Sequence, residues 1–149
     1  MLYFSYGSFL DSETLRRHCP GARFVGKAVL PNFEVQFNYM SRTYGGGVTG
    51  VEPAPGKKAQ GVVYEVSPEE MEHLDVVEAV PKGYYYRQTV LIVDDGGNLL
   101  EAETYRTTHP GGPFKPTKRY VALMIKGARE QGMDMDYIRE LESISTMDE

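Results

Sequence analysis

Residues 60–78 read QGVVYEVSPEEMEHLDVVE, a strand pattern that passes directly into a helix pattern. The β-branched and aromatic run from Gln60 to Val66 predicts a strand. Ser67 and Glu70 have the spacing of a capping box, and the proline between them suits the first helical position. We therefore expect a helix that begins after Ser67 and runs to about Val77.

Turn and cap residues divide the rest of the chain into short elements. The other expected strands cover residues 2–6, 22–30, 32–39, 84–93 and 98–105. The glycine-rich segment 44–50 is expected to form a flexible strand edge or turn, segment 53–56 a turn, and segment 94–97 a hairpin turn. The expected helices are one over residues 12–18 capped by Asp11, one from Thr117 to near Gly132, and a short one after Asp136. Strands dominate and helices surround them, which indicates one α+β domain over residues 1–149.

Composition excludes several classes of protein. The formal charge of −5 is spread along 149 residues without a concentrated basic stripe, so nucleic acid is not an expected partner. No apolar stretch is long enough for a transmembrane helix, and the N-terminus lacks the pattern of a signal peptide. Cys19 is the single cysteine, which rules out an internal disulfide. A cytoplasmic protein is the simplest expectation, and its eleven tyrosines suit the wall of a small polar pocket.

Two motifs for cofactors are too weak to carry a prediction. Residues 45–50 formally match G-x-G-x-x-G, but no helix can begin after them, as a dinucleotide site requires. His18, His73 and His109 are widely spaced in the sequence, so a zinc site would have to bring distant segments together. Each histidine is more simply a surface or helix-end residue. We therefore expect neither a metal nor an organic cofactor.

Ser8 follows an expected strand and precedes an expected helix, which resembles the setting of a nucleophilic serine. The glycines that such an elbow requires on both sides are replaced by Tyr6 and Leu10, which disfavours a serine hydrolase. Ligand binding fits better, because Gly7 lets the backbone approach a ligand and N–H groups there can hold an anion. The irregular segment 109–113, rich in Gly and Pro, is a candidate lid.

Glu78 is the residue whose chemistry stands out. It lies at a helix end among Val76, Val77 and Val80, and burial by these side chains would raise the pKa of its carboxyl group. A carboxylate with a raised pKa is a better general base. From this segment alone, a solvated glutamate at a helix end remains the alternative.

Four segments, in order, resemble motifs of the gamma-glutamylcyclotransferase-like (AIG2-like) family. Residues 3–10, YFSYGSFL, resemble the family opening Y-F-A-Y-G-S-N-L, and residues 74–78, LDVVE, resemble L-D-x-x-E-G. Residues 83–85, GYY, fall at a G-x-Y, and residues 120–130 resemble the C-terminal helix Y-x6-G-A-K-E. Each motif alone is weak, but together they span nearly the whole chain.

The resemblance implies a fold, an activity and a site. The fold would be a small mixed β-barrel-like core with flanking helices. The activity would cyclise a small gamma-glutamyl substrate to 5-oxoproline and release an amine or amino acid, without a cofactor and without nucleic acid or membrane as partner. The resemblance leaves open whether the protein forms a homodimer. The resemblance makes Glu78 the acid/base, and it places the substrate among Tyr3, Phe4, Ser5, Tyr6, Gly7, Ser8, Tyr85 and Tyr120.

Two residues depart from the family motifs. Phe9 stands where the family has Asn and removes the hydrogen-bonding groups of an amide, so substrate specificity can differ. Ala79 stands where the family has Gly after the glutamate. Two alternatives to the main hypothesis remain: a sibling activity on gamma-glutamyl-amines or a carrier-bound gamma-glutamyl group, and a non-catalytic binding module of the same fold.

Overall fold

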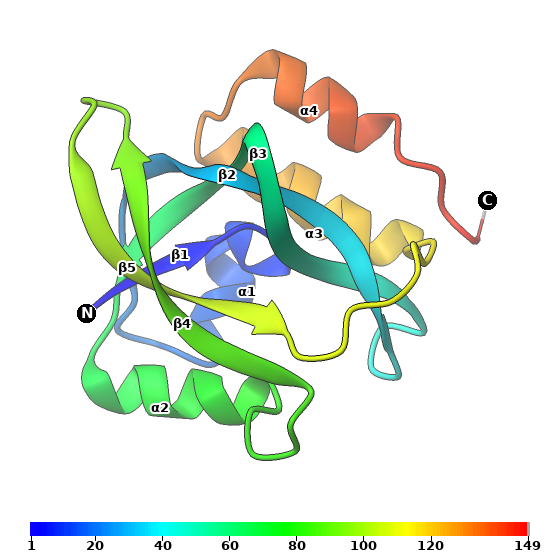
Figure 1. The fold of residues 1–149 in the computed structure, drawn as a ribbon, viewed down its shortest axis with the longest axis horizontal. Helices are drawn as coiled ribbons and strands as arrows, with labels where there is room; N and C mark the ends of the chain where they lie inside the picture. The colour runs from blue at the N-terminus through cyan, green and yellow to red at the C-terminus, as the bar shows by residue number, and fades with distance from the viewer. Residues whose placement is uncertain (149) are drawn as a thin grey trace.

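A closed barrel of β-strands forms the centre of the computed structural model, which describes residues 1–148 (Figure 1). Its strands are β1 (Leu2–Ser5), β2 (Arg23–Ser41), β3 (Gly46–Glu65), β4 (Tyr85–Asp94) and β5 (Leu99–Thr107). They are arranged in the order β1-β3-β2-β4-β5, and β1 closes the barrel by pairing in parallel with β5. The other pairs are antiparallel. The expected mixed β-barrel-like core is confirmed.

Helices flank the barrel. They are the short 3-10 helix η1 (Ser8–Leu10) and the α-helices α1 (Ser12–Arg16), α2 (Pro68–Val77), α3 (Lys118–Glu130) and α4 (Met135–Glu142). Figure 1 shows α3 and α4 packed beside each other against one side of the barrel, with α2 on another side. Within residues 1–148, none of the helices has the length and apolar character needed to cross a membrane.

The predicted helix caps are confirmed. The side chain of Asp11 accepts a hydrogen bond from the N–H of Thr14, and Ser67 and Glu70 form the complete capping box. The Thr117 side chain likewise caps α3. The last helix begins at Met135, slightly earlier than predicted, because Asp134 occupies its N-cap position.

The predicted division of the first hairpin is wrong. The two strands expected over residues 22–30 and 32–39 are one strand, β2, and the segments 44–50 and 53–56 belong largely to β3. Between the pairs Pro31–Lys58 and Phe33–Pro53 the ladder is interrupted by a bulge. Asn32 and Gly56 adopt φ angles of 63° and 83° there. The proline and glycine residues therefore mark a bend within long paired strands, not their ends.

Two clusters of apolar side chains make up the core. One is drawn from all five barrel strands and fills the barrel; its largest fully buried members are Phe4, Leu30, Val51, Val63 and Ile92. The other lies between the barrel and the helices and includes Leu10, Leu15, Met71, Leu74 and Met124. Side chains alternate between the two faces of a strand, so successive residues of β1 contribute to different clusters.

Candidate active site

A cavity of about 830 Å³ lies between the junction of β1 with η1, the C-terminal end of α2, the β2–β3 hairpin and the start of β4. Side chains from α1, β5 and α3 complete its wall. These segments are far apart in the sequence. The cavity is lined by all but one of the residues that the family resemblance selected: Tyr3, Ser5, Tyr6, Gly7, Ser8, Glu78, Tyr85 and Tyr120.

Phe4 is the exception. Its side chain has no exposed surface and belongs to the cluster inside the barrel, whereas its neighbour Tyr3 packs in the cluster on the helix side. The alternation of side chains along β1 explains the difference. The family motif covers every residue of β1, whereas only alternate side chains of the strand face the cavity. The Phe4 side chain is therefore not expected to contact the substrate.

Glu78 comes to the cavity because α2 ends there. Its N–H still donates to the carbonyl oxygen of Leu74 at 2.8 Å, and the next residue, Ala79, has a φ of 56°. The N–H of Val80 then donates to the carbonyl oxygen of Asp75 at 2.9 Å. Together these bonds close the C-terminal end of the helix with a residue in the left-handed region, a position that favours glycine.

Ala79→Gly is expected to stabilise the protein. Alanine at a left-handed φ carries a steric cost of about 1–2 kcal/mol, and the extra chain entropy of glycine in the unfolded state offsets part of the gain. We expect a net increase of about 0.5–1 kcal/mol in the free energy of unfolding, measured by urea denaturation. Ala28→Gly, within the buried interior of β2, is a control expected to destabilise. Equal or lower stability of Ala79→Gly would show that the turn is not strained.

The carboxyl group of Glu78 lies in an environment that disfavours its charge. Burial raises its pKa from 4.5 to about 7. By surface area the side chain is half-buried, because it faces the cavity while the surrounding protein removes most of its water. In the described part of the chain no group hydrogen-bonds to the carboxylate to hold it ionised. Val76, one of the valines that we expected to bury it, is 62% exposed, whereas Val77 and Val80 are partly buried against the core.

Tyrosines surround this carboxylate. Burial raises the pKa of Tyr3 and of Tyr85, and in both cases the charge of Glu78 raises it further. Burial also raises the pKa of Tyr120, to about 12, and Glu78 adds to the increase. These phenols therefore remain protonated near pH 7. Tyr3, Tyr85 and Tyr120 line the same cavity as Glu78.

Thr49 holds two of these tyrosines in place. The Tyr85 hydroxyl donates to the carbonyl oxygen of Thr49 at 2.8 Å, and the N–H of Thr49 donates to the Tyr120 hydroxyl oxygen at 3.2 Å. The Thr49 hydroxyl also lies 2.7 Å from the Tyr120 hydroxyl. Sequence reasoning missed Thr49, because it lies in the glycine-rich segment that we expected to be an irregular edge or turn.

Two glycines allow the walls of the cavity to approach each other. A Cβ atom on Gly7 would collide with the Thr49 hydroxyl and with the Tyr120 hydroxyl. A Cβ atom on Gly127 would collide with the backbone of Leu10 in η1. Gly127 lies seven residues after Tyr120, which puts both on the same face of α3. The close packing of α3 against η1 at Gly127 therefore helps to hold Tyr120 beside Gly7.

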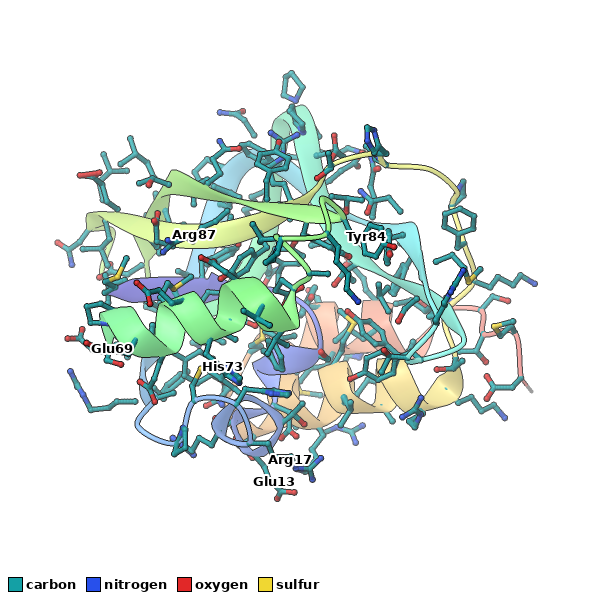
Figure 2. The ribbon with its side chains drawn as sticks, turned by 90° about the horizontal axis from the view of Figure 1, so that it is seen from below. Glu13, Arg17, Glu69, His73, Tyr84 and Arg87 are labelled. Atoms are coloured by element: carbon teal, nitrogen blue, oxygen red, sulfur yellow. The ribbon has the colours of Figure 1, made fainter. Side chains whose placement is uncertain are left out.

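An ionic network ties α2 to the barrel beneath the site. The Tyr105 hydroxyl, which lines the cavity, donates to the Asp75 carboxylate at 2.6 Å, and Asp75 pairs with Arg87 at 3.3 Å. Figure 2 shows Arg87 on the strand side of α2 and Tyr84 beyond its C-terminal end. Asp75 belongs to the same motif as Glu78 and lies one turn before it. The network thus fixes the end of α2 that presents Glu78.

One other expectation, the lid over residues 109–113, needs correction. Segment 109–113 does not line the cavity; its Gly111 N–H donates to the carbonyl oxygen of Asn38 at 2.8 Å, which ties the segment to β2. The cavity is bordered instead by segments 39–44 and 76–84. His18 and His73, far apart in the sequence, have ring centroids 5.9 Å apart, and His18 lines the cavity. Sequence spacing gave no signal of this contact.

The chain is similar to known proteins over almost its whole length. A family model described as the AIG2-like family matches residues 58–141. Gamma-glutamylcyclotransferases of Bos taurus and Homo sapiens are each 30% identical to it, over 99% of this chain and 80% of their own. A solved gamma-glutamyl cyclotransferase superposes with a TM-score of 0.94 at 28% identity, covering 98% of this chain and 88% of that one. YkqA from Bacillus subtilis shares the fold, with a TM-score of 0.81 at 20% identity, covering 98% of this chain and 55% of that one.

The closed mixed barrel, its flanking helices and its cavity place the chain in the gamma-glutamylcyclotransferase-like fold class. Within that class, the chain belongs to the AIG2-like family, to which its sequence motifs pointed.

Proposed function

We propose that the protein is a gamma-glutamylcyclotransferase, which converts a gamma-glutamyl compound into 5-oxoproline and a free amine or amino acid. The observation that carries the proposal is the desolvated carboxylate of Glu78, which has a pKa near 7 and faces a cavity walled by neutral tyrosines. A general base is most effective when its pKa lies near the working pH. The curated relatives that carry this activity in their names support the same function.

The reaction removes two protons from the attacking nitrogen and returns one to the leaving nitrogen. The α-ammonium of the substrate loses a proton to Glu78, which releases it to solvent, and the free amine attacks the γ-carbonyl carbon to form the new C–N bond. In the tetrahedral intermediate the attacking nitrogen loses its second proton to Glu78, and Glu78 transfers this proton to the leaving nitrogen as the bond to that nitrogen breaks. Because nucleophile and electrophile belong to one molecule, the main task of the cavity is to fold the glutamyl chain.

Backbone N–H groups near Gly7 are suited to bind a negatively charged part of the substrate. The N–H groups of Gly7 and Ser8 donate to no backbone acceptor in the described residues, and both residues line the cavity. They are suited to hold the substrate α-carboxylate or the oxyanion of the intermediate. Neutral Tyr120 and Tyr85 add hydroxyl groups on the other walls. We propose Tyr3, Ser5, Tyr6, Gly7, Ser8, Tyr85 and Tyr120 as the residues around the glutamyl group.

The test is a panel of gamma-glutamyl compounds incubated with the purified protein. We expect 5-oxoproline and the free leaving group to appear in a one-to-one ratio, measured by mass spectrometry, with undiminished rate after removal of divalent ions by a chelator. Binding without release of 5-oxoproline from any compound would instead favour the non-catalytic binding module. Hydrolysis to free glutamate would contradict the cyclisation.

A further inference from the structure

The hairpin tip, residues 41–45 between β2 and β3, forms one border of the cavity. Four of its five residues line the cavity, and none of the five is buried. The base of the hairpin is anchored, because the N–H of Gly47 donates to the carbonyl oxygen of Lys115 at 2.9 Å and a Cβ atom on Gly47 would collide with the backbone of Phe114. The hairpin tip therefore extends along the cavity from a fixed base.

Arg119, in the first turn of α3, connects the hairpin tip to the rest of the protein. Its Nη2 donates to the carbonyl oxygen of Thr43 at 3.1 Å, and its guanidinium carbon lies 4.7 Å from the centre of the Tyr44 ring. The other hydrogen bonds of the tip are formed within the hairpin. Within residues 1–148, Arg119 thus makes the only hydrogen bond that joins residues 42–45 to a segment outside the hairpin.

The contact with Arg119 extends to a wall of the candidate site. The Tyr44 ring packs edge to face with the Tyr120 ring, with centroids 4.9 Å apart, and both residues line the cavity. Tyr44 therefore contacts the exposed guanidinium of Arg119 as well as the buried Tyr120. Movement of the hairpin tip away from α3 would separate Tyr44 from Tyr120 and widen the entrance to the cavity.

The strength of these contacts suits reversible opening. A hydrogen bond and a cation–π contact at an exposed site shift an equilibrium only modestly, together about tenfold. Three consecutive glycines, residues 45–47, join the hairpin tip to its base, and their permissive backbone allows the chain to change direction there. The contacts thus favour the closed position and still permit frequent opening.

We propose that Arg119 is a positioning residue that acts through Thr43 and Tyr44 as a latch: it keeps the hairpin tip closed over the cavity, and its release admits the substrate and frees the products. This inference deepens the proposed function, on which its kinetic test rests. Arg119 does not itself line the cavity, so its effect differs from that of a residue that binds substrate. Loosening the latch should accelerate entry and exit alike and leave the affinity nearly unchanged.

The first measurement is NMR relaxation dispersion of the backbone amides of residues 42–45 in the protein without ligand, which detects motion on the μs–ms timescale. Arg119→Met keeps an unbranched side chain but removes the charge and the hydrogen-bond donors. We expect the population of the minor, open state to rise about tenfold in this variant. Arg119→Lys restores a cation and a donor and should cause a smaller rise.

Arg129→Met is the matched control on the same helix. Arg129 pairs with Glu142 of α4 and does not line the cavity. Its replacement removes a cation from α3 without touching the hairpin tip, so we expect the open-state population of the parent.

The second measurement is the rate of binding of gamma-glutamyl-alanine to proteins that also carry Glu78→Gln, in which the compound should not be turned over. NMR line shapes during a titration give the association and dissociation rate constants. We expect Arg119→Met to raise both rate constants about tenfold and to change the dissociation constant by less than about twofold. A residue with a merely structural role would not accelerate association.

An open-state population or binding rates equal to those of the parent would refute the latch. Faster dissociation without faster association would also refute it, because Arg119 would then support the bound state and not control entry. If no gamma-glutamyl compound binds, the proposed function fails, while relaxation dispersion of the free protein still decides whether Arg119 holds the hairpin tip closed.

Discussion

Glu78→Gln is expected to lower turnover of a gamma-glutamyl substrate by at least about 10³-fold while substrate binding is largely retained. Glutamine keeps the shape of the side chain but cannot accept a proton from an ammonium. General acid/base groups typically contribute about 10²–10⁴ in rate, and here one carboxylate acts in both directions. The measurement is kcat for formation of 5-oxoproline, together with the dissociation constant of the substrate by calorimetry.

Glu72→Gln provides the control for this experiment. Glu72 lies exposed on the same helix, so its replacement removes a carboxylate from α2 without altering the cavity. We expect near-normal turnover from this variant. Near-normal turnover from Glu78→Gln would remove Glu78 as the base, and the proposed activity would then depend on family membership alone.

The same substitution is expected to make the protein more stable at neutral and alkaline pH. The folded-state pKa of Glu78 is about 7, above the ordinary 4.5, so the folded state binds a proton more tightly than the unfolded state. Stability is therefore lost as pH rises from about 4.5 to about 7, and the full cost persists at higher pH. A shift of this size corresponds to about 3 kcal/mol, which partial exposure to cavity water reduces to about 2 kcal/mol.

Urea denaturation of the parent and of Glu78→Gln at several pH values tests this expectation. The two proteins should have similar free energies of unfolding near pH 4, where the parent carboxyl group is protonated, and differ by about 2 kcal/mol near pH 8. Glu72→Gln should show no comparable pH-dependent gain. A constant difference across this pH range would mean that Glu78 carries no desolvation cost in the folded protein.

Much of the fold was predictable because its signals are local. The capping box around Pro68 and the caps at Asp11 and Thr117 are confirmed, since each depends on hydrogen bonds between residues close in sequence. The hairpin turn between β4 and β5 is confirmed for the same reason. The long strand β3 was not predicted, because a bulge accommodates the turn-forming residues 53–56 within a ladder that only the whole barrel stabilises.

Prediction of the candidate site was limited in the same way, because contacts between distant segments leave no local signal in the sequence. The motifs brought together Glu78, Tyr85 and Tyr120 by resemblance, yet they also selected Phe4, whose side chain the strand directs into the barrel. Thr49 and Tyr105 were missed because their importance depends on contacts across the fold, to Tyr120 and to Asp75. The desolvation of Glu78 was anticipated, but residues from distant segments also enclose it, among them Tyr3, Tyr85 and Tyr120.

The most direct test of the account is the pKa of Glu78 itself. Carboxyl carbon NMR of glutamate-labelled protein, with Glu78→Gln to assign the signal, gives this pKa in the free enzyme. We predict a titration near pH 7, and an acid limb of kcat/KM for a gamma-glutamyl substrate at the same pH, with activity rising as the carboxylate forms. A Glu78 signal that titrates near 4.5, or an activity profile unrelated to it, would contradict the claim that this carboxylate is the base.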